Sequence, residues 1–293
     1  MQNTRFDYSP IITRPPLRWP DGARLAVWVA TNIEYFEVDQ PAASLRPVPY
    51  LPDVANYAWR DYGTRVGIWR IMELLDRCAV RSSVMLNSRV CHSYPIIVEE
   101  ATRRGWEFLG HGITNSRRLV KLSEDEERAV IHEVVTTIAA ATGMPPKGWL
   151  GPAMAETFNT PDLLAEVGIE YVCDWCNDDQ PYPMRVRANR LISVPYTNEL
   201  NDLPAFLGMG VSGEQFLQMI RDQFDVLYRE GARSGRVLCL SLHPFILGRP
   251  TRIRYLEEAL DYILGHDGVW CTTSGEIAAW YYEHYYEAPR PLA

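Results

Sequence analysis

The sequence predicts an α/β protein in which a parallel sheet, open or closed into a barrel, carries its helices on the outside. Strand-like runs alternate with helix-like segments about seven times over nearly the whole chain, a pattern typical of repeated βα units. The runs are short and continuously apolar, as in strands buried on both faces. The 293 residues, 47% of them hydrophobic, can form one substantial core. We therefore expect an N-terminal extension, residues 1–22, and a single barrel domain, residues 23–293.

The first predicted unit begins at residues 24–31, an apolar run that follows a Pro-Asp-Gly turn and reads as the first central strand. Residues 36–62 contain four prolines and no sustained period, which predicts one long ordered loop of the kind that shapes a site. Helical spacing returns over residues 65–78, and a strand follows over residues 81–87. These segments predict a β-loop-α-β unit.

Capping patterns mark several of the later helices. Ser123 with Glu126, and Ser212 with Gln215, have the spacing of helix N-terminal caps. A Thr-Pro pair opens another helix, which a glycine closes. The predicted helices are 95–104, 123–143, 160–168, 212–231, 251–265 and a last one that contains residues 280–282. The predicted strands are 106–109, 147–150, 169–173, 191–195, 237–242 and 269–271.

Composition excludes several classes of partner. Lys and Arg number 29 against 37 Asp and Glu, a net charge of −8, which argues against nucleic acid or an anionic membrane. The longest apolar stretches are far shorter than the roughly 20 residues that span a bilayer. No secretory signal is visible at the N-terminus, and six scattered cysteines fit reduced thiols. We therefore expect a cytoplasmic protein that acts on a small molecule.

Polar side chains stand where three predicted strands end. His111 and His243 directly follow apolar runs, and Asn32 and Glu34 follow the first strand. In a barrel, residues after each strand gather at one mouth, where the chemistry of such folds is placed. Imidazoles there can act as acid, base or metal ligand. The alternatives are satisfied packing histidines and a carboxylate that pairs with an arginine.

The histidine pair expected of a metal site is incomplete. His111 and Asn115 have the spacing of two ligands on one turn of chain, but an amide is a poor ligand for zinc. We therefore expect no cofactor, and a divalent metal such as zinc only if Glu34, His111 and Asn115 hold it. The sequence has no Gly-x-Ser-x-Gly elbow, GxGxxG motif or phosphate loop, which removes the main support for serine hydrolases and nucleotide enzymes. One Cys-x-x-Cys motif, residues 173–176, lacks the helix that a redox site needs.

Read in order, these strand-end residues resemble the polysaccharide deacetylase (NodB-homology) superfamily, and within it the branch of cofactor-independent allantoinases and cyclic imide hydrolases. The resemblance covers most of the chain and implies a distorted (β/α)7 barrel and a homo-oligomer, a dimer or tetramer. The pieces that carry it are Trp19–Arg24, Asn32–Glu34, Gly110–Gly112, Gly148–Gly151, Asp178–Tyr182, Val194–Thr197, Asn201–Asp202, Ser241–His243 and Gly248–Pro250.

The chain departs from the deacetylase motifs of that superfamily. Deacetylases carry two aspartates, a His-x3-His pair and a Leu-x-His acid. Asn32 stands at the position of the general base, and Asn115 stands at that of the second histidine. Glu34 is at the first ligand position and His243 at that of the acid, while the arginine of the third motif is missing. These departures remove the base for a metal-bound water and favour the allantoinase-like branch.

The leading hypothesis is hydrolysis of a ring C–N bond in a small cyclic amide. Glu34 is expected to position or activate water, His111 to bind the substrate carbonyl or assist the base, and His243 to protonate the leaving nitrogen. The expected substrate-binding residues are Asn32, Asn115, Trp149, Asp174 and Asp202. The alternatives are a metal-dependent carbohydrate N-deacetylase and a catalytically silent barrel used as a binding module.

Overall fold

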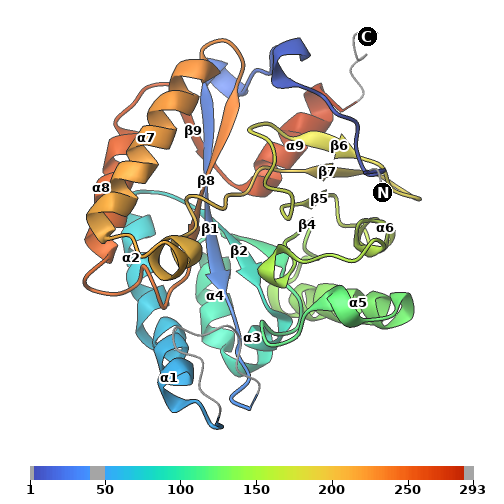
Figure 1. Ribbon diagram of the computed structural model, residues 1–293, viewed down its shortest axis with the longest axis vertical. Helices are drawn as coiled ribbons and strands as arrows, with labels where there is room; N and C mark the ends of the chain where they lie inside the picture. Colours follow the sequence, from blue (N-terminus) through green and yellow to red (C-terminus); the bar gives the residue numbers. More distant parts are fainter. Residues whose placement is uncertain (1–2, 40–49, 287–293) are drawn as a thin grey trace.

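The computed structural model describes residues 3–39 and 50–286, and its core is one curled sheet (Figure 1). Neighbouring strands run in the order β6-β7-β5-β4-β3-β2-β1-β8, and β9 also pairs with β1. All pairs are parallel except β6 with β7. The strands are β1 (Leu25–Ile33), β2 (Ser82–Leu86), β3 (Glu107–Gly110), β4 (Gly148–Trp149), β5 (Tyr171–Val172), β6 (Tyr182–Met184), β7 (Leu191–Ser193), β8 (Arg236–Leu242) and β9 (Val269–Thr272).

The helices lie outside the sheet, with α2, α7 and α8 grouped on one side and α5 and α6 beyond the other (Figure 1). Serine caps open α5 and α7 with both bonds of a capping box, as predicted from Ser123 and Ser212. The helices are α1 (Val54–Tyr62), α2 (Ile68–Arg77), α3 (Ser88–Ser93), α4 (Pro95–Arg103), α5 (Glu124–Thr142), α6 (Thr160–Glu166), α7 (Gly213–Gly231), α8 (Ile253–Leu264) and α9 (Ser274–His284). None of these is long and apolar enough to cross a membrane, over the residues described.

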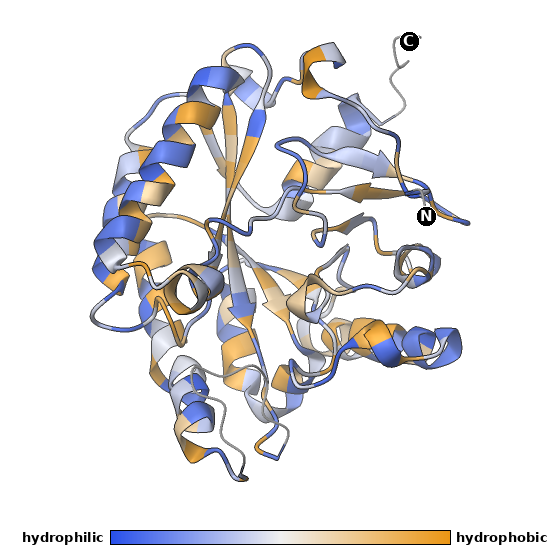
Figure 2. Cartoon of the chain, viewed as in Figure 1, coloured by the Kyte–Doolittle hydropathy of each residue, from blue (hydrophilic) through white to orange (hydrophobic). Residues whose placement is uncertain are grey.

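Strand β1 divides the core into two layers. Its odd residues, such as Val27 and Val29, pack with the helices, whereas the even residues Ala26, Trp28 and Ala30 belong to a second cluster inside the curl of the sheet. This follows from the period of two of a β-strand. Figure 2 shows the same arrangement, with hydrophobic strands at the centre and striped helices around them. Both faces of β1 and β8 are buried, as the continuous apolar runs predict.

The sheet closes toward a barrel without a complete ladder. β8 bonds on one side to β1, and on the other to segments that follow β5 and β7. Val237 donates its N–H to the carbonyl of Asp179 at 2.9 Å, and Ser241 donates to Leu200 at 3.0 Å. Asn201 forms an isolated parallel bridge to Ser241. These contacts confirm the predicted α/β fold and its distorted barrel form.

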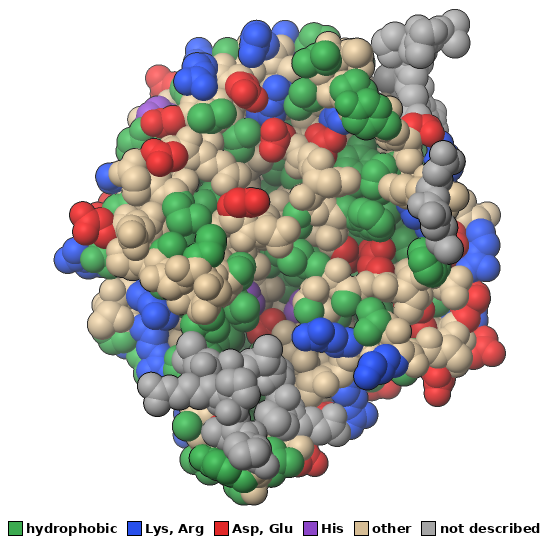
Figure 3. All heavy atoms as spheres, in the orientation of Figure 1, with side chains coloured by type: hydrophobic (Ala, Val, Ile, Leu, Met, Phe, Trp, Pro, Cys, Tyr) green, Lys and Arg blue, Asp and Glu red, His purple; other side chains and the backbone are tan. Residues whose placement is uncertain are grey.

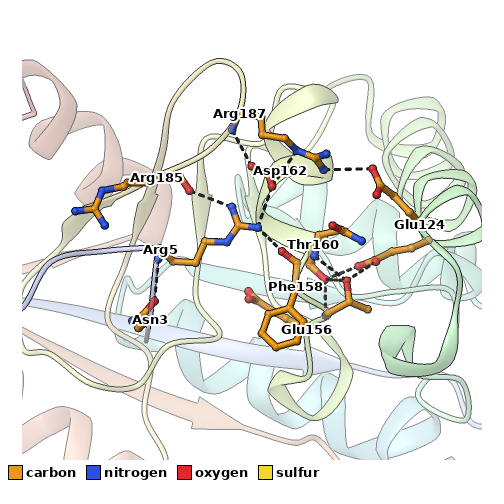
Figure 4. Close-up of polar contacts among 12 residues, drawn as sticks. Asn3, Arg5, Glu124, Glu156, Phe158, Thr160, Asp162, Arg185 and Arg187 are labelled. Carbon is orange, nitrogen blue, oxygen red and sulfur yellow. Dashed lines mark hydrogen bonds and ion pairs between the residues drawn. The ribbon is translucent and has the colours of Figure 1, made fainter. Parts of the chain in front are cut away.

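The described part of the N-terminal extension packs along the barrel domain. Arg5 forms an ion pair with Asp162 at 2.9 Å, and Arg187 binds the same carboxylate at 3.1 Å (Figure 4). Arg14 pairs with Asp178, and the Trp19 ring is buried, with its indole N–H donating to the carbonyl of Arg236. The extension therefore shares contacts with the barrel, although its treatment as a separate unit stays a prediction.

The prediction of one long loop over residues 36–62 is wrong for its second half. Residues 40–49 lie outside the described residues, but Val54–Tyr62 form α1, capped by Asp53, which accepts from the N–H of Asn56 at 3.1 Å. The four prolines that precede α1 predict a loop, so the periodicity of the sequence did not indicate where this helix begins. Helix α3 and strand β6 were also not predicted, since both are too short for a clear period.

Helix α1 continues into α2 through one π-helical turn, Gly63–Gly67, pressed against the chain after β8. A Cβ on Gly67 would lie 2.0 Å from the carbonyl oxygen of Pro244, and one on Gly63 would lie 2.7 Å from the nitrogen of Phe245. Only glycine permits this approach. The contact fixes α1 beside the segment that begins with His243.

Candidate active site

Three strands deliver one side chain each to a common point inside the barrel. Glu34 follows β1, His111 follows β3, and His243 follows β8. The Nε2 atoms of His111 and His243 lie 3.5 and 3.6 Å from the same oxygen, Oε1 of Glu34. All three side chains are at least nine-tenths buried. The structure thus brings together the three residues predicted to carry the chemistry.

Strand parity explains why these side chains face inward. In β1 the even residues line the interior, and Asn32 and Glu34 continue that series. In β3 and β8 the odd residues Leu109 and Cys239 are interior, so His111 and His243 follow on the same face. Because parallel strands end at one edge of the sheet, the three side chains converge.

His111 is held in one orientation. Its Nδ1 lies 2.6 Å from the carbonyl oxygen of Leu150, which can only accept, so Nδ1 carries a proton and Nε2 faces Glu34. The amide of Asn87 donates to the backbone carbonyl of His111 and, at 3.3 Å, to Oδ1 of Asn115. Asn115 in turn donates to Oε1 of Glu34. The side-chain amides of Asn87 and Asn115 therefore hold His111 and Glu34 in place on this side of the site.

His243 is held by Asp202. One carboxylate oxygen of Asp202 lies 2.6 Å from Nδ1 of His243, and the other accepts its backbone N–H at 2.7 Å. Burial acts to lower the pKa of His243, but the negative charges of Glu34 and Asp202 raise it to about 10. His243 therefore carries a positive charge at neutral pH and has a proton to give.

Glu34 is an ionised carboxylate within this cluster. Burial acts to raise its pKa, but the charge of His243 and the close approach of both imidazoles to Oε1 lower the pKa of Glu34 to about 2. Its second oxygen, Oε2, is buried and has no hydrogen-bond partner among the described residues. The carboxylate therefore presents one oxygen to the histidines and one to a potential ligand.

The other predicted binding residues differ in their placement. The Asn32 amide donates to Ser241 at 3.1 Å and to the carbonyl of Leu242 at 3.2 Å, within a polar network that includes Tyr196. Trp149 packs with the helix-side cluster and is fully buried there. Substrate contact by either residue stays a prediction.

Asp174 belongs to a second carboxyl pair, which the sequence did not reveal because Glu156 stands several residues beyond the end of β4 rather than directly after a strand. Oδ1 of Asp174 accepts the N–H of Gly151 at 2.8 Å, and Trp175 donates to Glu156 at 3.2 Å. Burial raises the pKa of Asp174 to about 6, and burial with the charge of Asp174 raises the pKa of Glu156 well above its usual range. The pair therefore retains a proton near neutral pH.

A narrow cavity opens beside Glu34 and contains a residue that sequence reasoning missed. Its walls include Asn32, Glu34, Phe36, Phe245 and the buried Arg60 of α1. Arg60 falls in the segment predicted as loop, and no motif marks it. Figure 3 shows histidine and acidic atoms at the base of a hollow on this face of the molecule.

The residues present do not fit a metal site. Within the described ranges no group of three His, Cys, Asp or Glu side chains is arranged to hold a metal ion. Of the predicted set, Asn115 turns its NH2 group toward Glu34 and its oxygen toward Asn87, so it offers no oxygen to an ion beside Glu34. Glu34 and His111 alone are fewer than the three protein ligands of a catalytic zinc.

Comparison with known proteins assigns the family. A sequence profile described as polysaccharide deacetylase matches residues 59–172. A crystal structure titled "probable polysaccharide deacetylase", from Pseudomonas aeruginosa PAO1, is 30% identical with a TM-score of 0.85 and covers 93% of this chain and 96% of its own. The chain belongs to the polysaccharide deacetylase family. The predicted resemblance is thereby confirmed, and it places the chain among hydrolases that act on C–N bonds other than peptide bonds.

Two further relatives of the family match almost the full length. The PuuE allantoinase structure is 27% identical, with a TM-score of 0.85, and the match covers 96% of this chain and 99% of that one. A Schizosaccharomyces pombe protein named as a polysaccharide deacetylase is 29% identical over 317 residues, 95% of this chain and 96% of its own. The likeness to an allantoinase agrees with the branch predicted from the sequence.

Proposed function

We propose that the protein opens the ring of a small cyclic amide, a ureide or cyclic imide, by hydrolysis of a C–N bond. The observation that carries this proposal is one carboxylate oxygen of Glu34 between the Nε2 atoms of two imidazoles, each held at Nδ1 by an acceptor. Such a cluster holds an acid and a water-orienting carboxylate in one dry place. Its similarity to PuuE allantoinase supports the same reaction class.

In the proposed reaction, Glu34 and His111 orient a water molecule toward the ring carbonyl carbon, because the carboxylate and Nε2 of His111, whose ring proton is on Nδ1, both accept hydrogen bonds from water. The water oxygen bonds to the carbon, the C–N bond breaks, and His243 gives its Nε2 proton to the leaving nitrogen. Glu34 is a weak base while His243 is charged, because that charge lowers its pKa. Loss of the His243 proton removes this effect, so Glu34 takes the proton of the water as His243 releases its own.

The other residues position these groups in the proposal. Both oxygens of Asp202 are engaged by His243, so we assign Asp202 to holding the acid rather than contacting substrate. Asn115 holds Glu34 and has its own amide held by Asn87. Asp174 orients the backbone of Gly151, the residue after the Leu150 carbonyl that holds His111.

Carbohydrate N-deacetylation is the second candidate, favoured by the names of two of the relatives. Asn32 cannot act as a base, so in this reaction too Glu34 would have to take the proton of the water. Deacetylation of acetylated aminosugars that a chelator abolishes would support this candidate over ring opening.

The test of the main proposal is turnover of small rings. Purified protein is incubated with allantoin, hydantoin, succinimide and dihydrouracil, and loss of the ring is followed by absorbance and chromatography. We expect one of these rings to open, and His243→Gln to lose at least ~10²-fold in rate as a missing general acid. The control is His266→Gln, which changes a histidine in the turn between α8 and β9. No ring opening, or an unaffected His243 variant, would contradict the mechanism; ligand binding without turnover would favour a silent binding module.

The assembly and location of the protein remain predictions. A cytoplasmic dimer or tetramer is expected from the sequence and the family branch. Light scattering on the purified protein and fractionation of cells measure these two properties directly.

A further inference from the structure

We infer that Arg60 determines substrate specificity by binding a second carbonyl oxygen, the one attached to the leaving nitrogen. The inference rests on the proposed function and narrows it to rings whose cleaved nitrogen lies between two carbonyl groups, as in cyclic imides and hydantoins. It follows from the place of Arg60 in the cavity and from the charge that forms there.

Arg60 is buried in the wall of the cavity that Glu34 also lines. The side chain is only 7% exposed, and its guanidinium carbon lies 4.0 Å from the centre of the Phe36 ring. Glu34, two residues before Phe36, lines the cavity with it, as does Phe245, two residues after His243. Burial lowers the pKa of Arg60, and the negative charge of Glu34 acts in the opposite direction, so the two groups interact electrostatically.

The position of Arg60 is fixed relative to His243. The Trp59 ring packs against Phe245 at 4.8 Å, nearly perpendicular to it. The glycines that follow α1 press its end against Pro244 and Phe245, where any Cβ would collide. The helix that carries Arg60 is therefore held in place beside the segment that begins with His243.

The chemistry of the leaving group explains the need for a cation. When the C–N bond of an imide breaks, the negative charge on nitrogen spreads to the oxygen of the adjacent carbonyl. His243 becomes neutral as it protonates this nitrogen. Arg60, by contrast, lines the cavity as a cation that stays charged throughout the reaction, because a guanidinium keeps its proton in proteins. Its planar donors suit a carbonyl oxygen, and the arrangement stabilises charge as it develops.

The same argument sets the substrate class. An N-acetylated aminosugar leaves as an amine and has no second carbonyl on its nitrogen, and a simple lactam lacks it too. Binding by Arg60 therefore discriminates imide-type rings from both.

The experiment compares succinimide with 2-pyrrolidinone, a ring of equal size that has one carbonyl fewer. Affinities are measured by calorimetry for the wild-type protein and for Arg60→Gln, Arg60→Lys and Arg65→Ala. Arg65 is the control, an arginine with a 76% exposed side chain in the turn after α1. We expect the wild type to bind succinimide about tenfold or more tightly than the lactam, the scale of one charged hydrogen bond. Arg60→Gln should abolish this preference, Arg60→Lys restore part of it, and Arg65→Ala leave it intact.

Each result separates the two ideas. Equal binding of both rings by the wild type, a measurement that needs no variant, overturns the role of Arg60. Ring opening with an unchanged preference in Arg60→Gln overturns it as well, while leaving the proposed function in place. A preference that depends on Arg60 without any ring opening supports the assignment and refutes the catalytic proposal.

Discussion

Replacement of Asp202 by asparagine tests the origin of the positive charge on His243. The carboxylate makes two short contacts to His243, 2.6 Å to Nδ1 and 2.7 Å from the backbone nitrogen. Asparagine has nearly the same shape but no charge, so the fold is preserved while the attraction is lost. A buried hydrogen bond to a charged group contributes about 1.5–3 kcal/mol, which equals about one to two pH units in the pKa of His243.

We therefore expect the pKa of His243 to fall from about 10 by roughly that amount in Asp202→Asn. Carbon-13 labelling of histidine and NMR titration between pH 5 and pH 11 measure it, with His243→Gln used to assign the resonance. Activity should fall ~10²–10⁴-fold if His243 is the general acid that Asp202 orients. Asp162→Asn, which alters another buried aspartate beside Arg5, is the control. A pKa that moves less than half a pH unit would refute the electrostatic account.

Three more outcomes follow from the described contacts. Glu34→Gln removes the charge that most raises the pKa of His243. In the wild type, charged His243 contributes stability at low pH that is lost as the pH rises through its folded pKa of about 10. In the variant this stability should be lost at a lower pH, which urea midpoints at pH 7, 9 and 10 measure. The pKa of Asp174 is raised to about 6, so the wild type loses stability as the pH rises toward that value. Glu156→Gln removes the repulsion between the two carboxylates, so its urea midpoint should gain more at pH 8 than at pH 4.5. An equal change at both pH values would contradict the pairing. Gly67→Ala should destabilise by about 1–3 kcal/mol through overpacking against the chain after β8, whereas Gly143→Ala, where no atom lies near, should show only the smaller strain of its positive φ.

The local elements could be predicted where a physical pattern is confined to a few residues. The capping boxes at Ser123 and Ser212 specify helix starts because the side chain bonds to a backbone group three residues away. Helix α1 could not be found in this way, because the prolines before it suggest a loop and its start depends on Asp53 alone. Its buried face is settled by contact with the chain after β8.

The amino-acid sequence by itself determined the alternation of strands and helices and the three side chains that follow the strand ends. Glu34, His111 and His243 could be proposed because the period of a strand and the common end of parallel strands are properties of local geometry. Only the tertiary structure decided which charged side chains lie close enough to interact electrostatically. Asp202 came to His243, Glu156 to Asp174 and Arg60 to Glu34 through packing between distant segments, and electrostatic coupling depends on those distances rather than on position in the chain.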